Sequence, residues 1–207
     1  MKRFFAIVAA VAACAAVAYA CKSCGEGAAA DCDKADAVLE TIMTRTSVRA
    51  FTDRPIEDEK IELMLRAGMA APTAVNKQPW AFVVVRSREQ LDRLCDTNPN
   101  ARMLATAQAA IVVCGDMTKA IEGPMQSFWI QDASAATENI LLAAHALGLG
   151  AVWTGVYPNP ERVAAVSDVL GLPEYAVPLC VIPMGYPAES PQPKEKWKPE
   201  NVHCDRW

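Results

Sequence analysis

The sequence predicts one domain of the α/β or α+β class, in which helices pack on a single layered sheet. Apolar runs of strand length alternate with segments of helical periodicity between residues 35 and 183. Neither an internal repeat nor an interior linker divides them. A chain of 207 residues that is 52% hydrophobic and 21% charged can bury one sizeable core and is unlike a disordered chain.

The individual elements follow from apolar periodicity and from the residues that end each run. Asp58 is expected to cap the second helix, and Pro72 ends it because proline cannot continue a helix. Residues 185–207 are rich in proline and lysine and are expected to form a tail that wraps over another surface. Helices are expected over 35–45, from 58 to before Pro72, and over 87–95, 125–147 and 160–170, with strands over 80–85, 109–114, 151–154 and 176–183.

The first twenty residues are expected to be an export signal. Lys2 and Arg3 precede seventeen uncharged residues, and Ala18-Tyr19-Ala20 is a cleavage motif directly before Cys21. A retained membrane anchor is the alternative, and Cys21 also permits lipid attachment. The expected location is therefore periplasmic or in the cell envelope, free or lipid-anchored, and cytoplasmic only if residues 1–20 are not a signal.

Residues 21–36 are expected to be a polar tether that contains cysteines and precedes the folded domain, 37–207. Cys21 and Cys24 form a C-x-x-C pair, with Cys32 close by. A local disulfide or a lipidated cysteine is favoured over a redox or metal motif, because no strand leads into a helix at this point. Three further cysteines lie in apolar stretches of the sequence and are predicted to be core residues: Cys95, Cys114 and Cys180.

Charge and histidine content argue against two classes of protein. With 20 Lys and Arg against 24 Asp and Glu, the chain lacks the basic field of a general nucleic-acid binder. It has two histidines and no HExxH motif, so a His-rich zinc hydrolase is disfavoured and no metal site is predicted. His145 lies in an apolar helical run and is expected to be a packed residue.

Arginines gather at one place in this acidic chain. Arg45, Arg49 and Arg54 lie within ten residues, and Thr46 and Ser47 stand between the first two. In an extended segment Arg45, Ser47 and Arg49 point to one side, where two guanidinium groups and a hydroxyl suit a phosphate or another planar anion. A solvated cationic helix end is the alternative.

Two further stretches place polar groups beside predicted strands. The loop from Pro72 to Pro79 carries Asn76, Lys77 and Gln78 and leads directly into a buried strand. A later strand ends at Thr154-Gly155, where backbone N–H groups are available at a usual place for ligands. A solvated loop and a simple strand end are the alternatives.

The tail carries a third polar stretch. Lys194, Lys196 and Lys198 alternate along it, and they either bind an anion or form a solvated basic segment.

Together, and in this order, these stretches resemble the nitroreductase family of FMN-dependent oxidoreductases. The motifs are Arg-x-Ser-x-Arg at 45–49, Ala-Pro-Thr-Ala-x-Asn-x-Gln-Pro-Trp at 71–80, Gly-Leu-Gly-Ala-x-Trp-x-Gly at 148–155 and Lys-x-Lys at 194–196. The resemblance runs from about residue 37 to residue 207. It implies an α+β fold, a mixed sheet flanked by helices, and an intertwined homodimer with two FMN sites at its interface.

The resemblance also implies roles for individual residues. Arg45 and Ser47 would hold the phosphate and ribityl chain, and Arg49 would approach the pyrimidine side of the ring. The 72–76 loop would reach the flavin from the partner subunit, and the Thr154-Gly155 backbone would face flavin N5. The residues implied to bind FMN are Arg45, Thr46, Ser47, Arg49, Pro72, Thr73, Ala74, Asn76, Gln78, Thr154, Gly155, Lys194 and Lys196.

The implied activity is ping-pong hydride transfer from NAD(P)H through flavin N5 to a nitroaromatic, a quinone or a similar small electrophile. Phe128 and Trp129 form the candidate substrate wall, although an aromatic pair at such a place belongs to the core more often than to a substrate site. Two other functions stay open: a specialised family member such as a dehalogenase, and an exported flavin-binding electron-transfer protein that uses Cys21 and Cys24. An exported protein would also need a donor outside the cytosol, where NAD(P)H is found.

Overall fold

The computed structural model describes residues 26–207, with side chains from residue 33 onward. The predicted leader, Cys21 and Cys24 lie outside the described residues. The chain divides into two units, 1–43 and 44–207. None of the helices described between residues 26 and 207 is both long enough and apolar enough to span a bilayer.

The described part of the first unit belongs to helix α2 (Glu26–Thr44). The helix begins at Glu26 rather than at Ala35, so much of the predicted tether is helical. The physical reason is the alanine run at 28–30, because alanine has the highest helix propensity. Its exposed apolar side chains are Val38, Leu39, Ile42 and Met43.

The second unit is built on one antiparallel sheet, which confirms the α+β class. The strands are β1 (Trp80–Val85), β2 (Ala109–Asp116), β3 (Gly150–Ala151), β4 (Thr154–Gly155) and β5 (Ala176–Gly185). Their order is β1-β2-β5-β3, and β4 also pairs with β5. All four pairings are antiparallel, so the described strands supply no parallel pair to the mixed sheet that the resemblance implies.

The strand predicted over 151–154 is in fact two strands of two residues each, β3 and β4. Both pair with β5, and Val152 and Trp153 lie between them. The apolar run therefore gave the right location but not the interruption, because the break depends on how the chain follows β5 in three dimensions.

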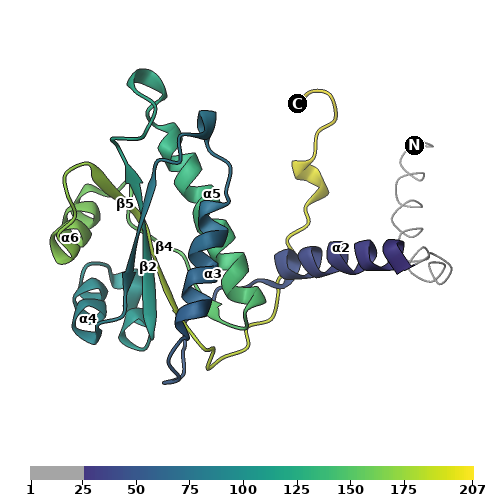
Figure 1. Cartoon of the computed structure of the whole chain (residues 1–207), viewed down its shortest axis with the longest axis horizontal. Helices are drawn as coiled ribbons and strands as arrows, with labels where there is room; N and C mark the ends of the chain where they lie inside the picture. The colour runs from purple at the N-terminus through teal and green to yellow at the C-terminus, as the bar shows by residue number, and fades with distance from the viewer. Residues whose placement is uncertain (1–25) are drawn as a thin grey trace. The chain divides into compact units, whose positions relative to one another are not determined.

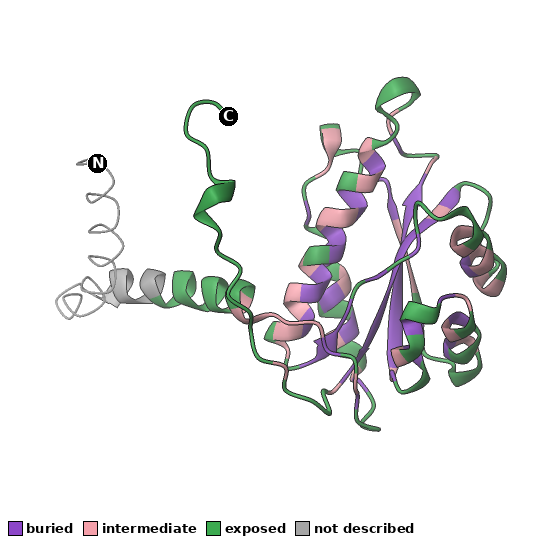
Figure 2. Ribbon diagram, turned by 180° about the vertical axis from the view of Figure 1, so that it is seen from behind, coloured by how far each residue is buried: buried purple, intermediate pink, exposed green. Residues whose placement is uncertain are grey.

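Helices cover both faces of the sheet, as Figure 1 shows. Helices α3 (Asp58–Met69) and α5 (Phe128–Ala146) lie on one face, and α4 (Arg88–Asp96) and α6 (Pro160–Leu170) on the other. Strand β2 is buried along its whole length (Figure 2), because it lies between β1 and β5 with helices on both sides. Successive β2 side chains enter opposite cores: Ile111 and Val113 face the α3–α5 side, and Val112 faces the α4–α6 side.

One helix cap and one helix start on the sheet differ from those predicted. Asp58 is the first residue of α3, and the residue before it, Glu57, makes no side-chain cap bond. Helix α5 begins at Phe128, because Gly123–Met125 forms a separate 3-10 turn that contains a proline. Cys114 and Cys180 lie in the core as predicted, and burial raises the pKa of each thiol to about 12. Cys95 is only partly buried.

A polar cluster around Tyr186 ties the start of α3 to the end of α5. The Tyr186 hydroxyl donates to the Glu57 carboxylate at 2.7 Å, and Arg54 donates to the same carboxylate at 2.8 Å. Lys60 Nζ donates to the Tyr186 hydroxyl at 2.9 Å and to the Leu147 carbonyl at 2.8 Å. The hydrogen bond from Tyr186 is the main cause that lowers the pKa of Glu57 to about 2.

This cluster predicts a pH dependence of stability. A carboxylate with a lowered pKa contributes stability above its ordinary pKa of 4.5, and that contribution is lost as the pH falls toward about 2. We expect Glu57→Gln and Tyr186→Phe both to flatten the fall in the free energy of unfolding across this window, measured by urea titration. A wild-type slope in both variants would show that the Glu57 carboxylate is not stabilised in the fold.

Candidate functional site

The arginine segment and the C-terminal tail meet around one cavity of about 280 Å³. Its lining contains four cationic side chains and no carboxylate, a composition that suits an anion. The structure thus brings together the first and last of the predicted motifs, at residues 45–49 and 194–196. The lining residues are Arg45, Thr46, Ser47, Arg49, Pro191, Gln192, Lys194 and Lys196.

Backbone contacts hold the arginine segment against the tail and the sheet. The Arg49 and Ala50 amides donate to Glu189 Oε1 at 2.6 and 3.2 Å, and the Ala188 amide donates to the Ala50 carbonyl at 2.9 Å. Val48 points into the core, and its amide donates to the Ala151 carbonyl at 3.1 Å. With Val48 buried in an extended segment, its neighbours Ser47 and Arg49 are left to face the cavity.

Helix α5 also contacts Arg45. Its Nε lies 3.4 Å from Glu138 Oε1, and only 18% of its side chain is exposed. The guanidinium is therefore placed before any ligand arrives, which reduces the conformational entropy lost on binding. Its remaining N–H donors are available to the cavity that it lines.

A second cavity, of about 310 Å³, adjoins the first because Arg49 lines both. Thr154 and Gly155 form part of its wall, as the sequence predicts. The Thr154 hydroxyl donates to the Val181 carbonyl at 2.7 Å and is buried in the sheet, so this residue offers its backbone rather than its hydroxyl. The other lining residues are Asn98, Asn100, Met103, Val152, Trp153 and Arg162.

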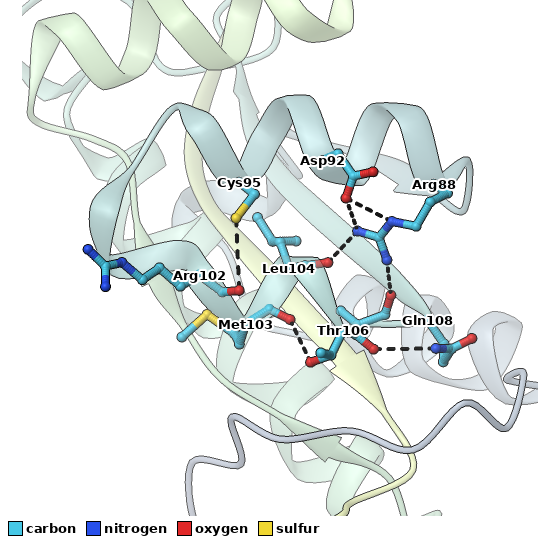
Figure 3. Close-up of polar contacts among 9 residues, drawn as sticks. Arg88, Asp92, Cys95, Arg102, Met103, Leu104, Thr106 and Gln108 are labelled. Carbon is cyan, nitrogen blue, oxygen red and sulfur yellow. Dashed lines mark hydrogen bonds and ion pairs between the residues drawn. The ribbon is translucent and has the colours of Figure 1, made fainter.

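Sequence reasoning missed Asn98, Asn100, Met103 and Arg162. Asn98-Pro99-Asn100, directly after α4, is the local sequence signal for a turn here. Arg88 on α4 fixes the following 3-10 helix η2 (Pro99–Ala105), since its guanidinium donates to the Leu104 and Ala107 carbonyls. Figure 3 shows this clamp, which holds Met103 and its neighbours in place.

Gly155 differs from the other glycines between residues 33 and 207. Gly68, Gly115, Gly150 and Gly185 lie against side chains that leave no room for a Cβ, and Gly123, Gly148 and Gly171 have positive φ. Gly155 has an ordinary φ and nothing within 4 Å of its Cβ position. Nothing in the described chain therefore requires glycine here, so the open space is suited to a bound group that approaches the backbone closely.

The loop predicted to bind the flavin does not enter either cavity of its own chain. Pro72, Thr73, Ala74 and Asn76 line neither cavity, and Gln78 lines a separate hollow of about 440 Å³ beside Trp80 and Lys77. The backbone of this loop has three residues with positive φ, Val75 (48°), Asn76 (55°) and Gln78 (49°). The loop is anchored on α5, where Asp132 Oδ1 accepts from the Ala74 amide at 2.9 Å.

Of the two candidate wall residues, Trp129 lies in the core. Trp129 is 5% exposed, packs edge-on against Tyr157 with ring centroids 5.0 Å apart, and fills the space beside Gly115. It is therefore a core residue of this chain, which is the more common position for such an aromatic pair. Phe128 is half-buried and lines neither cavity. His145 also packs as expected, with Nε2 at 2.9 Å from the Thr44 hydroxyl.

Comparison with known proteins assigns the chain to a family. The sequence model of the nitroreductase family matches residues 42–98 and 95–186 of this chain. A protein of Methanothermobacter thermautotrophicus, provisionally named NADH dehydrogenase/NAD(P)H nitroreductase, is 46% identical over 82% of this chain and 87% of its own.

Two solved structures agree. A protein of Parabacteroides distasonis with the same provisional name is 48% identical, with a TM-score of 0.78 over 82% of this chain and 98% of its own. A provisionally named nitroreductase of Desulfovibrio desulfuricans, solved in complex with FMN, is 31% identical, with a TM-score of 0.69 over 82% of this chain and 97% of its own. The chain belongs to the nitroreductase family.

Proposed function

We propose that this chain is an FMN-dependent NAD(P)H oxidoreductase. The observation that carries the proposal is the pair of adjoining cavities that share Arg49, one cationic and one walled by Gly155. The donors fit the cofactor: Arg45 and the tail lysines suit a phosphate dianion, and the second cavity suits the ring. The relative from Desulfovibrio desulfuricans was solved with FMN bound.

The chain's own residues would bind and orient rather than transfer protons. Arg45, Ser47, Lys194 and Lys196 would hold the phosphate, and Arg49, at the boundary of the two cavities, would stabilise negative charge near the ring. Bound FMN would supply the hydride chemistry, so no acid–base pair is needed in the chain. The proposed kinetic scheme is ping-pong, with NAD(P)H and then a nitroaromatic, quinone or similar electrophile occupying the same site.

We also propose that the working form is a homodimer. Three separate surfaces support this: the apolar side chains of α2, the strained 73–78 loop that enters neither cavity, and the tail, where Trp197 is 69% exposed. Contact with a second copy would bury these apolar groups and bring the loop to the partner's cavity. Sedimentation of the purified chain as a monomer at micromolar concentration would contradict this part of the proposal.

Export remains a proposal, supported by the charged start, the apolar run and the cleavage motif before Cys21. Mass spectrometry of the mature N-terminus tests it directly. Removal of residues 1–20 is the expected result, and an added lipid mass at Cys21 would show anchoring. An intact Met1 in protein recovered from the native cell would contradict export.

The oxidoreductase proposal predicts a spectroscopic cycle. FMN added to the purified chain should bind, with quenched fluorescence, and NAD(P)H added without oxygen should bleach its visible absorption. A nitroarene or quinone should then restore the colour. A chain that does not take up FMN would overturn the proposal, and bound FMN that only a dithiol reduces would favour electron transfer without NAD(P)H.

A further inference from the structure

The carbonyl of Gly155 accepts hydrogen bonds from two side chains that come from different elements. Asn98 Nδ2 lies 3.3 Å from this oxygen, and an Nη of Arg162 lies 3.4 Å from it. Asn98 precedes η2, and Arg162 lies in the first turn of α6. Both side chains line the cavity that Gly155 also lines.

The Asn98 side chain is buried and hydrogen-bonded in this position. It is 3% exposed, and burying a polar side chain is unfavourable unless it is hydrogen-bonded. Its Oδ1 accepts from the Asn100 amide at 2.9 Å and so caps η2, while its amide group donates to Gly155. At the other end of η2, Arg88 donates to the Leu104 carbonyl and so holds this short helix on α4 (Figure 3).

The peptide that joins Gly155 to Val156 is held at both ends. Its carbonyl accepts from Asn98 and Arg162, and the Val156 amide donates to the Leu179 carbonyl at 3.0 Å. Strand β4 has only two residues, so it makes few ladder contacts of its own. The two side chains therefore add to the pairing of β4 with β5 in fixing the cavity wall at Gly155.

We propose that Asn98 and Arg162 are positioning residues that hold the Gly155 backbone against the ring of the cofactor and so set its reduction potential and its rate of reduction. This inference rests on the proposed function. The phosphate anchors lie in the other cavity, so the two side chains act on the geometry at the ring rather than on the grip on the phosphate. Displacement of a reacting centre by a fraction of an ångström is enough to slow catalysis.

The test uses variants that separate the hydrogen bond from Asn98 to Gly155 from the role of Asn98 as the N-cap of η2. Asn98→Ser keeps an oxygen able to cap η2 but loses the amide donor to Gly155. Arg162→Ala removes the second donor, and Arg162→Lys restores a cation there. Arg102→Ala is the matched control, because Arg102 is an exposed arginine on the same η2 whose side chain points away from the residues drawn with it (Figure 3).

We expect Asn98→Ser and Arg162→Ala each to lower the rate of FMN reduction by about three- to tenfold, the equivalent of one lost hydrogen bond. The midpoint potential should shift in both, the dissociation constant for FMN should stay within about twofold, and Arg162→Lys should recover part of the loss. Because both donors act on one carbonyl, the double variant should depart from additivity. Arg102→Ala should behave as wild type.

Two results would overturn the inference. One is a wild-type potential and rate in Asn98→Ser, and the other is loss of FMN from it, which would make Asn98 a binding residue. Hydrogen exchange of the Val156 amide in the cofactor-free chain provides a readout that does not depend on FMN, and it should be faster in Asn98→Ser. Wild-type protein that does not bind FMN would instead refute the proposed function, while the exchange result would still report on the contact.

Discussion

Replacing Arg45 with alanine is expected to weaken FMN binding by at least about tenfold, because hydrogen bonds to charged groups contribute about 1.5–3 kcal/mol each. The loss is enlarged by Glu138, whose carboxylate lies 3.4 Å from Arg45 Nε and would remain near the phosphate without its partner. The measurement is a fluorescence titration of FMN against the cofactor-free chain at fixed ionic strength, since salt screens such contacts.

Two further variants test whether the loss of FMN affinity in Arg45→Ala is specific to the guanidinium at this position. Arg45→Lys keeps the charge but not the planar fork, so it should bind FMN with an intermediate affinity. Arg54→Ala removes an arginine of the same segment that pairs with Glu57 and lines neither cavity, so FMN affinity should be unchanged. Full FMN affinity in a folded Arg45→Ala chain would remove the cationic cavity from the proposed site.

The second large effect is expected at Gly155. In the chain itself Gly155→Ala should be tolerated, because its φ is ordinary and no atom lies within 4 Å of the new Cβ. Its free energy of unfolding should be unchanged or raised by about 0.4–1 kcal/mol, since alanine restricts the unfolded chain. The methyl group would nonetheless occupy space in the second cavity, so FMN affinity or the rate of its reduction should fall by about tenfold or more.

Gly150→Ala is the matched comparison. A Cβ at Gly150 would lie 2.6 Å from Val48 Cγ1, so this variant should lose about 1–3 kcal/mol of stability through overpacking. The free energy of unfolding in urea and the FMN affinity of both variants together distinguish a glycine that packing requires from a glycine that ligand binding requires. Wild-type FMN affinity and reduction in Gly155→Ala would show that the ring does not lie in the second cavity.

Much of the fold could be predicted from local pattern. The apolar run 109–114 lies within β2, and the periodic segment 160–170 is helix α6, because burial on a sheet or helix face dictates where apolar residues recur. Local pattern leaves two outcomes open where local signals compete. The aromatic pair at 128–129 could be core or wall, and the position of Trp129 against Gly115 and Tyr157 depends on segments distant in sequence.

The sequence by itself determined the class of fold, the family and the chemistry of the cationic motifs, since these depend on residue type and on spacing within short segments. The tertiary structure decided which motifs share a cavity. It placed Ser47 near Lys194, brought Asn98 to Gly155 across 57 residues, and kept the 72–78 loop out of both cavities. Such contacts depend on how the sheet pairs and how helices pack on it, and no local periodicity encodes them.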